Sequence, residues 1–157
     1  MMVSGPDTIV SGKGVAAMYP EHEHLKLLLR CINLTPIRTT SENDLDIFTA
    51  GVCMPAAIVK AESLNRQQAD IDKIGTEYPL LSELYKWAVT ALPYFPNDAD
   101  KEAYIERMIT KGGITEAIIN SLTNGASLDA ALQRGIDRTK EISKEKVSDY
   151  CRSYMDE

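Results

Sequence analysis

The sequence predicts an all-α fold, an irregular bundle of five or six helices with a flexible N-terminal arm and a long C-terminal helix. Apolar residues recur at intervals of three and four along most of the chain, which is the spacing of one helix face. β-branched residues fall at the same helical positions and do not alternate with polar ones. The one Asn-Gly pair, Asn124-Gly125, lies between helical patterns and not between two strand-like runs. We therefore expect no strands.

The length and composition favour one soluble domain. The chain has 157 residues, of which 44% are hydrophobic and 25% charged, and this composition supports a packed core. Residues 1–18 are interrupted by Gly5, Pro6 and Gly12, which favour turns. We expect a flexible N-terminal arm over 1–18 and a single helical domain over 19–157.

The first two predicted helices are separated by a Thr-Pro pair. Pro20 suits a first helical turn, and an apolar series follows it, so a helix is predicted over 20–35. Ser41 is a good N-cap for a second helical segment, which runs to about residue 64. Because Pro55 lies inside this segment, we expect a kink or two shorter helices that meet near Gly51.

The middle of the chain contains a polar connection and two helices. Residues 65–79 are mostly polar, and one helical turn is predicted at 70–74. Leucines at helical spacing then predict a helix over 79–92. Asn97 is the expected N-cap of a further helix over 98–111, which two glycines end.

Two helices complete the predicted bundle. A short one begins at Thr115 and ends before Gly125. Ser127 is the expected N-cap of a long helix that reaches nearly to Met155. Gly135 lies inside that helix and costs about 1 kcal/mol relative to Ala, which weakens the prediction that the helix is unbroken.

The charge balance is acidic. Seventeen Lys and Arg against 23 Asp and Glu give a net charge of −6, and the pI is near 5.0. This balance disfavours nucleic acid and anionic membranes as partners, because both are bound through concentrated positive charge. No apolar run approaches the roughly 20 residues that span a bilayer. The polar N-terminus predicts a cytoplasmic protein, or a secreted or periplasmic one if that N-terminus replaces a removed leader.

The three cysteines, Cys31, Cys53 and Cys151, are far apart and form no Cys-x-x-Cys pair. Reduced, buried cysteines are the simpler interpretation, and one disulfide with a free thiol is the alternative. Cys53 precedes a helix that begins near Pro55, where the helix dipole lowers a thiol pKa. With His22 or His24 it would form a nucleophile–base pair. Nothing in the sequence brings these groups together, so a buried structural cysteine is the favoured interpretation.

The stretch Glu21-His22-Glu23-His24 contains both histidines. A zinc pair on a helix needs histidines four residues apart, and these are two apart. Glu21 and His24 do share a face, but no second Glu-x-x-His motif supplies the remaining ligands. The sequence therefore predicts no bound metal and no cofactor, and the stretch is interpreted as a solvated first helical turn.

The C-terminal helix carries an acidic ridge, which we define as Asp137, Glu141, Glu145 and Asp149, spaced every fourth residue. Such a ridge is typical of an amphipathic helix packed on a bundle, and it is also the candidate binding surface for a protein partner, a basic one in particular. Basic residues three positions along, Lys140, Lys144 and Arg152, are expected to pair with Asp137, Glu141 and Asp149.

These features favour a non-catalytic binding or accessory protein, such as an adaptor, a chaperone-like protein or an immunity-type inhibitor, that acts through its acidic helical surface. The alternative is a small metal-dependent or cysteine-dependent enzyme that uses Glu21 and His24 or uses Cys53. A third hypothesis is self-association through an unburied face of the Leu25–Ile32 helix or of the helix over 128–155.

Overall fold

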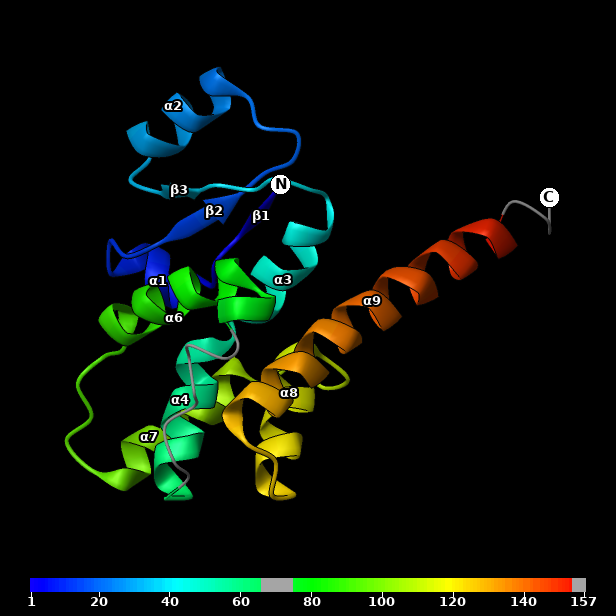
Figure 1. Cartoon of the computed structure of the whole chain (residues 1–157). Coiled ribbons are helices and arrows are strands. Elements are labelled where there is room, and N and C mark those ends of the chain that lie inside the picture. Colours follow the sequence, from blue (N-terminus) through cyan, green and yellow to red (C-terminus); the bar gives the residue numbers. More distant parts are fainter. Residues whose placement is uncertain (66–74, 154–157) are drawn as a thin grey trace.

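The computed structural model describes the backbone of residues 1–65 and 75–153 and the side chains of residues 1–65 and 75–145. Most of these residues are helical, and a long helix closes the chain, as the sequence predicts (Figure 1). The described elements occur in the order β1 (Met2–Val3), α1 (Pro6–Val10), β2 (Val15–Ala17), α2 (Glu23–Cys31), β3 (Thr35–Ile37), α3 (Asn43–Gly51), α4 (Met54–Ser63), α6 (Pro79–Ala91), α7 (Asp98–Met108), α8 (Ile114–Thr123) and α9 (Leu128–Ser153).

The predicted break in the second helical segment is confirmed. Helix α3 ends at Gly51 and α4 begins at Met54, so Pro55 lies in the first turn of α4, where its missing N–H costs nothing. Gly51 also allows a close helix crossing, because a Cβ atom there would lie 2.3 Å from Leu84 Cδ1 of α6. The helical turn predicted at 70–74 lies outside the described residues.

The predicted cap of α7 is also confirmed. The side chain of Asn97 accepts a hydrogen bond from the backbone N–H of Asp100 at 3.0 Å, which satisfies one of the free donors of the first turn. Helix α7 ends at Met108, three residues before the predicted end. Helices α6, α8 and α9 begin within one residue of their predicted starts.

The prediction that the chain has no strands is wrong. Strands β1 and β2 pair antiparallel, and β2 pairs in parallel with β3. Each strand has only two or three residues, too few to show an alternating pattern, and Pro36 argues against a strand by the usual criterion. The backbone N–H of Thr35 donates to the Gly14 carbonyl at 2.9 Å. In a parallel ladder the next nitrogen, that of Pro36, points to the open edge, where no donor is needed.

Residues 1–18, expected to form a flexible arm, instead supply β1, α1 and β2. Ala16 and Ala17 of β2 are fully buried, and Val15 joins the main core. The segment is also fastened to α6, because the Trp87 indole N–H donates to the Lys13 carbonyl at 2.8 Å. Gly12 lies in a turn as predicted, whereas Gly5 and Pro6 instead begin α1, and the small buried residues of β2 carry no strong sequence signal.

The main core lies between α3, α4, α6, α7, α8 and α9. Its largest fully buried side chains come from all of these helices except α7 and include Phe48, Met54, Leu81, Leu84, Ile118, Leu122, Leu132 and Ile136. Helix α9 packs chiefly against α8 and α3, and its C-terminal part extends beyond them (Figure 1). Of the described helices, only α1 and α2 contribute no residue to this core.

A second, smaller cluster lies beneath α2. It consists of Ala16 and Met18 from β2 and the residue after it, Leu29 of α2, and Leu34 just before β3. Helix α2 is the crossover between the parallel strands β2 and β3, and it lies at one end of the molecule with the strands between it and the other helices (Figure 1). Leu29 is the buried residue of α2. Apart from the half-buried Lys26, the other residues of the helix are exposed.

Helix α9 is continuous through Gly135, and the glycine has a packing role. A Cβ atom at this position would lie 2.7 Å from Cδ1 and 2.8 Å from Cγ1 of Ile118, which is fully buried in α8. The absent side chain thus sets the close approach of α8 and α9, and this approach outweighs the helix propensity lost at Gly135.

We predict that Gly135→Ala destabilises the protein although alanine is the better helix former. The propensity gain is about 1 kcal/mol, and the displaced Ile118 should cost about 1–3 kcal/mol. Urea denaturation should show a lower free energy of unfolding. Ala130→Gly, at an exposed position of α9, is the matched control and should cost about 1 kcal/mol through propensity alone. A Gly135→Ala variant more stable than wild type would contradict this packing role.

Candidate functional site

Helix α2 is short and ends sharply. It begins at Glu23, three residues after the predicted start, and has Ile32 as its C-cap. Asn33 follows with φ of 63°, the left-handed conformation that ends many helices and that asparagine tolerates. The turn returns the chain to the sheet at Thr35.

An ion pair links the inner side of α2 to the segment just before the helix. Lys26 Nζ lies 2.6 Å from Glu21 Oε2 and 3.0 Å from Glu23 Oε1. Glu21 also accepts a hydrogen bond from the Thr39 backbone N–H at 3.4 Å, beyond the end of β3. The hydrogen bond from Lys26 lowers the pKa of Glu21. Lys26 and Leu29 therefore define the side of α2 that faces the protein.

The opposite side of α2 exposes large apolar side chains. Leu27 is 62% exposed, Leu28 and Ile32 are each 56% exposed, and Leu25 is 43% exposed. Cys31, with a free thiol, is exposed among them. We call these five residues, Leu25, Leu27, Leu28, Cys31 and Ile32, the α2 face. At 100° per residue they occupy a continuous arc of roughly 160°, which contains His24 but no Asp, Glu, Lys or Arg.

Charged residues border the α2 face along one edge. Glu23 lies at the N-terminal end of this edge and Arg30 at the C-terminal end, seven residues apart and therefore on the same side of the helix. Glu23 pairs with Lys26, whereas Arg30 forms no ion pair with any residue that the structure describes. The edge thus carries opposite charges at its two ends.

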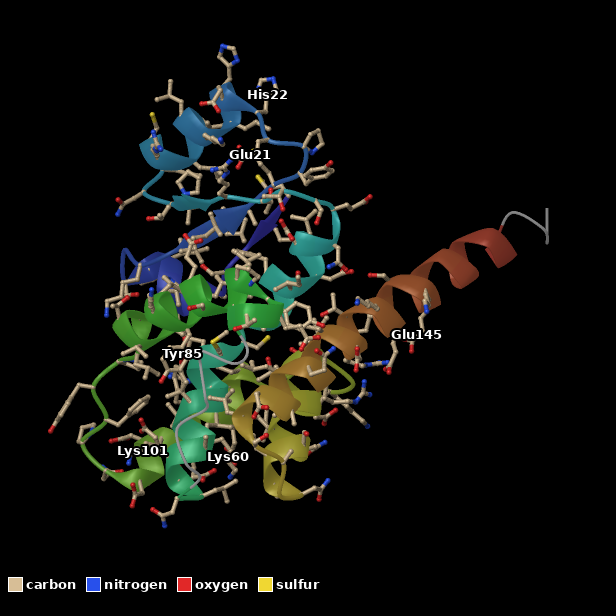
Figure 2. The ribbon with its side chains drawn as sticks, in the orientation of Figure 1. Glu21, His22, Lys60, Tyr85, Lys101 and Glu145 are labelled. Carbon is tan, nitrogen blue, oxygen red and sulfur yellow. The ribbon has the colours of Figure 1, made fainter. Side chains whose placement is uncertain are left out.

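In the structure Glu21 and His24 make different contacts and do not form a shared site. Glu21 is used by Lys26 and Thr39, while the His22 and His24 rings lie 5.4 Å apart at their centroids and are exposed. Figure 2 shows Glu21 and His22 at the outer, α2 end of the molecule. Among the side chains that the structure describes, no three of His, Cys, Asp or Glu gather in a way that could hold a metal ion.

Cys53 lies in the wall of a pocket of about 470 Å³ between α1, α4, α7 and α8. Its thiol donates to the Thr49 carbonyl at 3.5 Å, and burial raises the pKa of the thiol. The helix dipole at the start of α4 therefore does not produce a thiolate at neutral pH. Neither histidine lines the pocket, so the described part of the chain brings no nucleophile–base pair together there.

The most buried polar side chain of this pocket is Tyr104 of α7, which is 4% exposed. Burial and, to a lesser degree, the Asp7 carboxylate raise the pKa of Tyr104 to about 12. Arg107 lines the same wall. The pocket therefore presents a protonated phenol and a protonated thiol at neutral pH, both hydrogen-bond donors and neither an activated nucleophile.

The acidic ridge on α9 is paired within the helix. Glu141 accepts two hydrogen bonds from Arg134, at 2.8 and 3.2 Å, and lies 3.0 Å from Arg138 Nη1. Arg138 also lies 2.9 Å from Glu145 and donates through Nε to the Gly112 carbonyl. These pairs, and not the expected lysine pairs, are the contacts of Glu141 and Glu145, and the hydrogen bonds from Arg134 and then Arg138 lower the pKa of Glu141.

The other two members of the ridge differ. Asp137 is exposed and accepts a hydrogen bond from the Gln133 amide at 3.1 Å. The side chain of Asp149 lies outside the described residues. Glu145 is on the part of α9 that extends past α8 (Figure 2). Because two arginines neutralise two of its carboxylates, the ridge has a weaker field than four aligned acids would give.

The cysteine predictions differ in outcome. Cys31 and Cys53 are both unpaired in the structure, as the reduced interpretation requires. Cys31, expected to be buried, is instead exposed on the α2 face. Cys151 lies beyond the described side chains.

No helix in the described part of the chain has both the length and the apolar character that crossing a bilayer requires. Comparison of the chain with protein-family models, with curated proteins and with solved structures finds no match.

Two features of the site escaped sequence reasoning for different reasons. The excess of leucines on α2 was visible, and it prompted the hypothesis of an unburied face, but the buried side could not be chosen without the sheet. The second feature is the pocket that α1 and α7 line with Asp7, Tyr104 and Arg107. These residues come together only because the N-terminal segment packs against α7, far along the chain. A helix-by-helix analysis contains no signal for it.

We predict that Cys31 reacts with a neutral thiol reagent much faster than Cys53 at pH 7. Cys31 is exposed, whereas burial raises the pKa of Cys53 and limits its access. Peptide mapping by mass spectrometry after timed labelling distinguishes the two sites. Cys53 should become reactive only with denaturant. Equal rates in the native protein would instead support an activated Cys53 and the enzyme alternative.

We predict that Tyr104 ionises late and that its titration lowers stability at alkaline pH. Its folded pKa is about 12, against about 10 in the unfolded chain. Its contribution is therefore complete below pH 10 and is lost as the pH rises from about 10 towards 12. Tyrosinate absorbance during a pH titration should show a late-ionising group that Tyr104→Phe removes. An unchanged titration in that variant would contradict the assignment.

Proposed function

We propose that this protein is a non-catalytic binding or accessory protein whose protein partner docks on the α2 face. The observation that supports this proposal is the exposure of Leu25, Leu27, Leu28 and Ile32, each between 43% and 62%, on one uncharged side of one helix. Single exposed apolar residues are ordinary, but contiguous apolar patches mark interaction sites.

The energetics favour docking on this face. Removing half-exposed leucine or isoleucine side chains from water contributes on the order of 1 kcal/mol each. The face contains no carboxylate, ammonium or guanidinium group whose desolvation would oppose this gain. A helix that lays an apolar side into a groove or against another helix is a common mode of recognition.

The position of α2 also favours docking. The helix lies at the end of the molecule, beyond the strands, so a partner can approach it without displacing another element (Figure 1). The Glu21–Lys26 ion pair and Leu29 fix the helix from its inner side, and none of these groups belongs to the α2 face. The face is therefore presented in one orientation, which reduces the entropy lost on binding.

The acidic ridge is the second candidate surface. Its pairing with Arg134 and Arg138 reduces the attraction that it offers a basic partner, so we rank it below the α2 face. The exclusion of nucleic acid and of membranes, and a cytoplasmic location, stay predictions from composition. The alternative of a metal-dependent or cysteine-dependent enzyme also stays a hypothesis. The thiol-labelling experiment above tests the cysteine-dependent form, and metal analysis of protein purified without an affinity tag tests the metal-dependent form.

We predict that Leu28→Asp weakens partner binding at least tenfold while the fold persists. The carboxylate would lie at the centre of the α2 face and could not be desolvated cheaply. Val89→Asp, on α6 and 48% exposed, is the matched control because it places the same charge on another half-exposed helical position. Each purified variant serves as bait in an extract of the source organism, and any stoichiometric protein captured is then purified and re-bound to the bait.

Binding of the purified partner to wild type and Val89→Asp, but at least tenfold weaker binding to Leu28→Asp, is the expected result. Circular dichroism checks that all three are folded. A partner that binds Leu28→Asp as tightly as wild type would overturn the assignment to α2. If that partner is lost from Glu141→Gln/Glu145→Gln instead, the acidic ridge is the surface.

A further inference from the structure

We infer that the partner on the α2 face is a second copy of this chain, packed antiparallel through α2 about a two-fold axis. This inference rests on the proposed function and names its occupant. A two-fold interface uses the same patch on both subunits, so the patch must be complementary to itself. The α2 face and its charged edge meet this condition.

The charges supply the first argument. Glu23 and Arg30 lie at opposite ends of the same edge, and Arg30 has no ion-pair partner in the described part of its own chain. In an antiparallel helix pair the same edges of the two helices meet, running in opposite directions. Glu23 of each copy then meets Arg30 of the other. In a parallel two-fold pair the charged edges of the two helices lie on opposite sides of the contact, so Glu23 and Arg30 gain no partner across it.

The apolar residues supply the second argument. A two-fold axis near the midpoint between Leu27 and Leu28 makes the α2 face pair with itself without placing a charged group at the centre. The resulting contacts between one copy and the other are Leu27 with Leu28, His24 with Cys31, Leu25 with Ile32, and Glu23 with Arg30. One axis therefore aligns the apolar contacts and the charge pair together.

The size of the face sets the expected strength. Helix α2 has nine residues and is about 13 Å long, so two copies bury an area near or below the lower end of stable interfaces. We therefore expect a weak dimer with a Kd of roughly 10–100 µM, and not a permanent one. Such a dimer exchanges subunits readily, which makes it testable by mixing.

The test is sedimentation velocity of the full chain from about 5 to 500 µM at low salt, a range that spans the expected Kd. Wild type and Val89→Asp should shift from monomer to dimer, and Leu28→Asp should stay monomeric.

Glu23→Arg and Arg30→Glu should each weaken self-association roughly tenfold, because each places like charges opposite one another twice. An equimolar mixture of these two variants should dimerise like wild type, because both contacts are again between opposite charges.

The same variants decide the geometry. Recovery in the mixture that disappears at high salt supports the antiparallel pair. Dimerisation that depends on Leu28 but is indifferent to both charge reversals overturns it. In the antiparallel pair the two Cys31 residues lie about 10 Å apart along the helix direction, which is too far for a disulfide. Rapid oxidative cross-linking through Cys31, removed by Cys31→Ser, would therefore show a parallel pair.

The outcomes also separate this inference from the proposed function. A wild-type chain that stays monomeric at every concentration, yet binds a purified partner through Leu28, overturns the second copy and leaves the α2 docking surface intact. A chain that neither dimerises nor loses any interaction in Leu28→Asp overturns both.

Discussion

Parallel strands cannot be joined by a tight turn, and the pairing of β2 with β3 therefore requires the chain to cross over between them. Helix α2 is that crossover, and its position follows from the ladder and not from its own leucines. The sheet beneath it has only short strands, so it can cover little of the helix. Leu29 reaches the small cluster with Met18 and Leu34, and the remaining apolar residues of α2 stay outside. The exposed face thus results from the small size of the sheet.

The rest of the molecule is organised around close helix crossings. Gly51 admits Leu84 of α6 against α3, and Gly135 admits Ile118 of α8 against α9. These crossings bring six helices into one core, to which β2 and β3 add Val15, Ala17 and Ile37, whereas α2 packs only on the smaller cluster through Leu29. A rigid body that presents one short helix is suited to binding, because ordering that helix costs little when a partner arrives.

Much of the helical content could be predicted from sequence because its signals are local. The Asn97 side chain caps α7 by accepting a hydrogen bond from the backbone N–H of Asp100, only three residues along the chain. Pro55 marks the start of α4, because its ring fits only the first turn of a helix. The strands could not be predicted, because β2 and β3 are stabilised by each other and by Ser4, whose hydroxyl accepts from the Val15 N–H. For the candidate site, the apolar pattern of α2 is visible in the sequence, but its exposed side depends on Met18 and Leu34, which the strand pairing brings beneath Leu29. The arginine pairing of the acidic ridge has a local signal, because Arg134 and Arg138 lie at helical spacing from Glu141.

The contact between Trp87 and Lys13 gives the molecule an intrinsic optical reporter. The chain contains one tryptophan, and its indole N–H donates to a carbonyl in the connection between α1 and β2. Tryptophan emission therefore arises at one place, where the N-terminal segment contacts α6. Detachment of that segment would change the solvent around the indole before the six-helix core opens, whereas circular dichroism would follow the helices. Non-coincident fluorescence and dichroism transitions would show that the unit that carries α2 opens independently of the body that supports it.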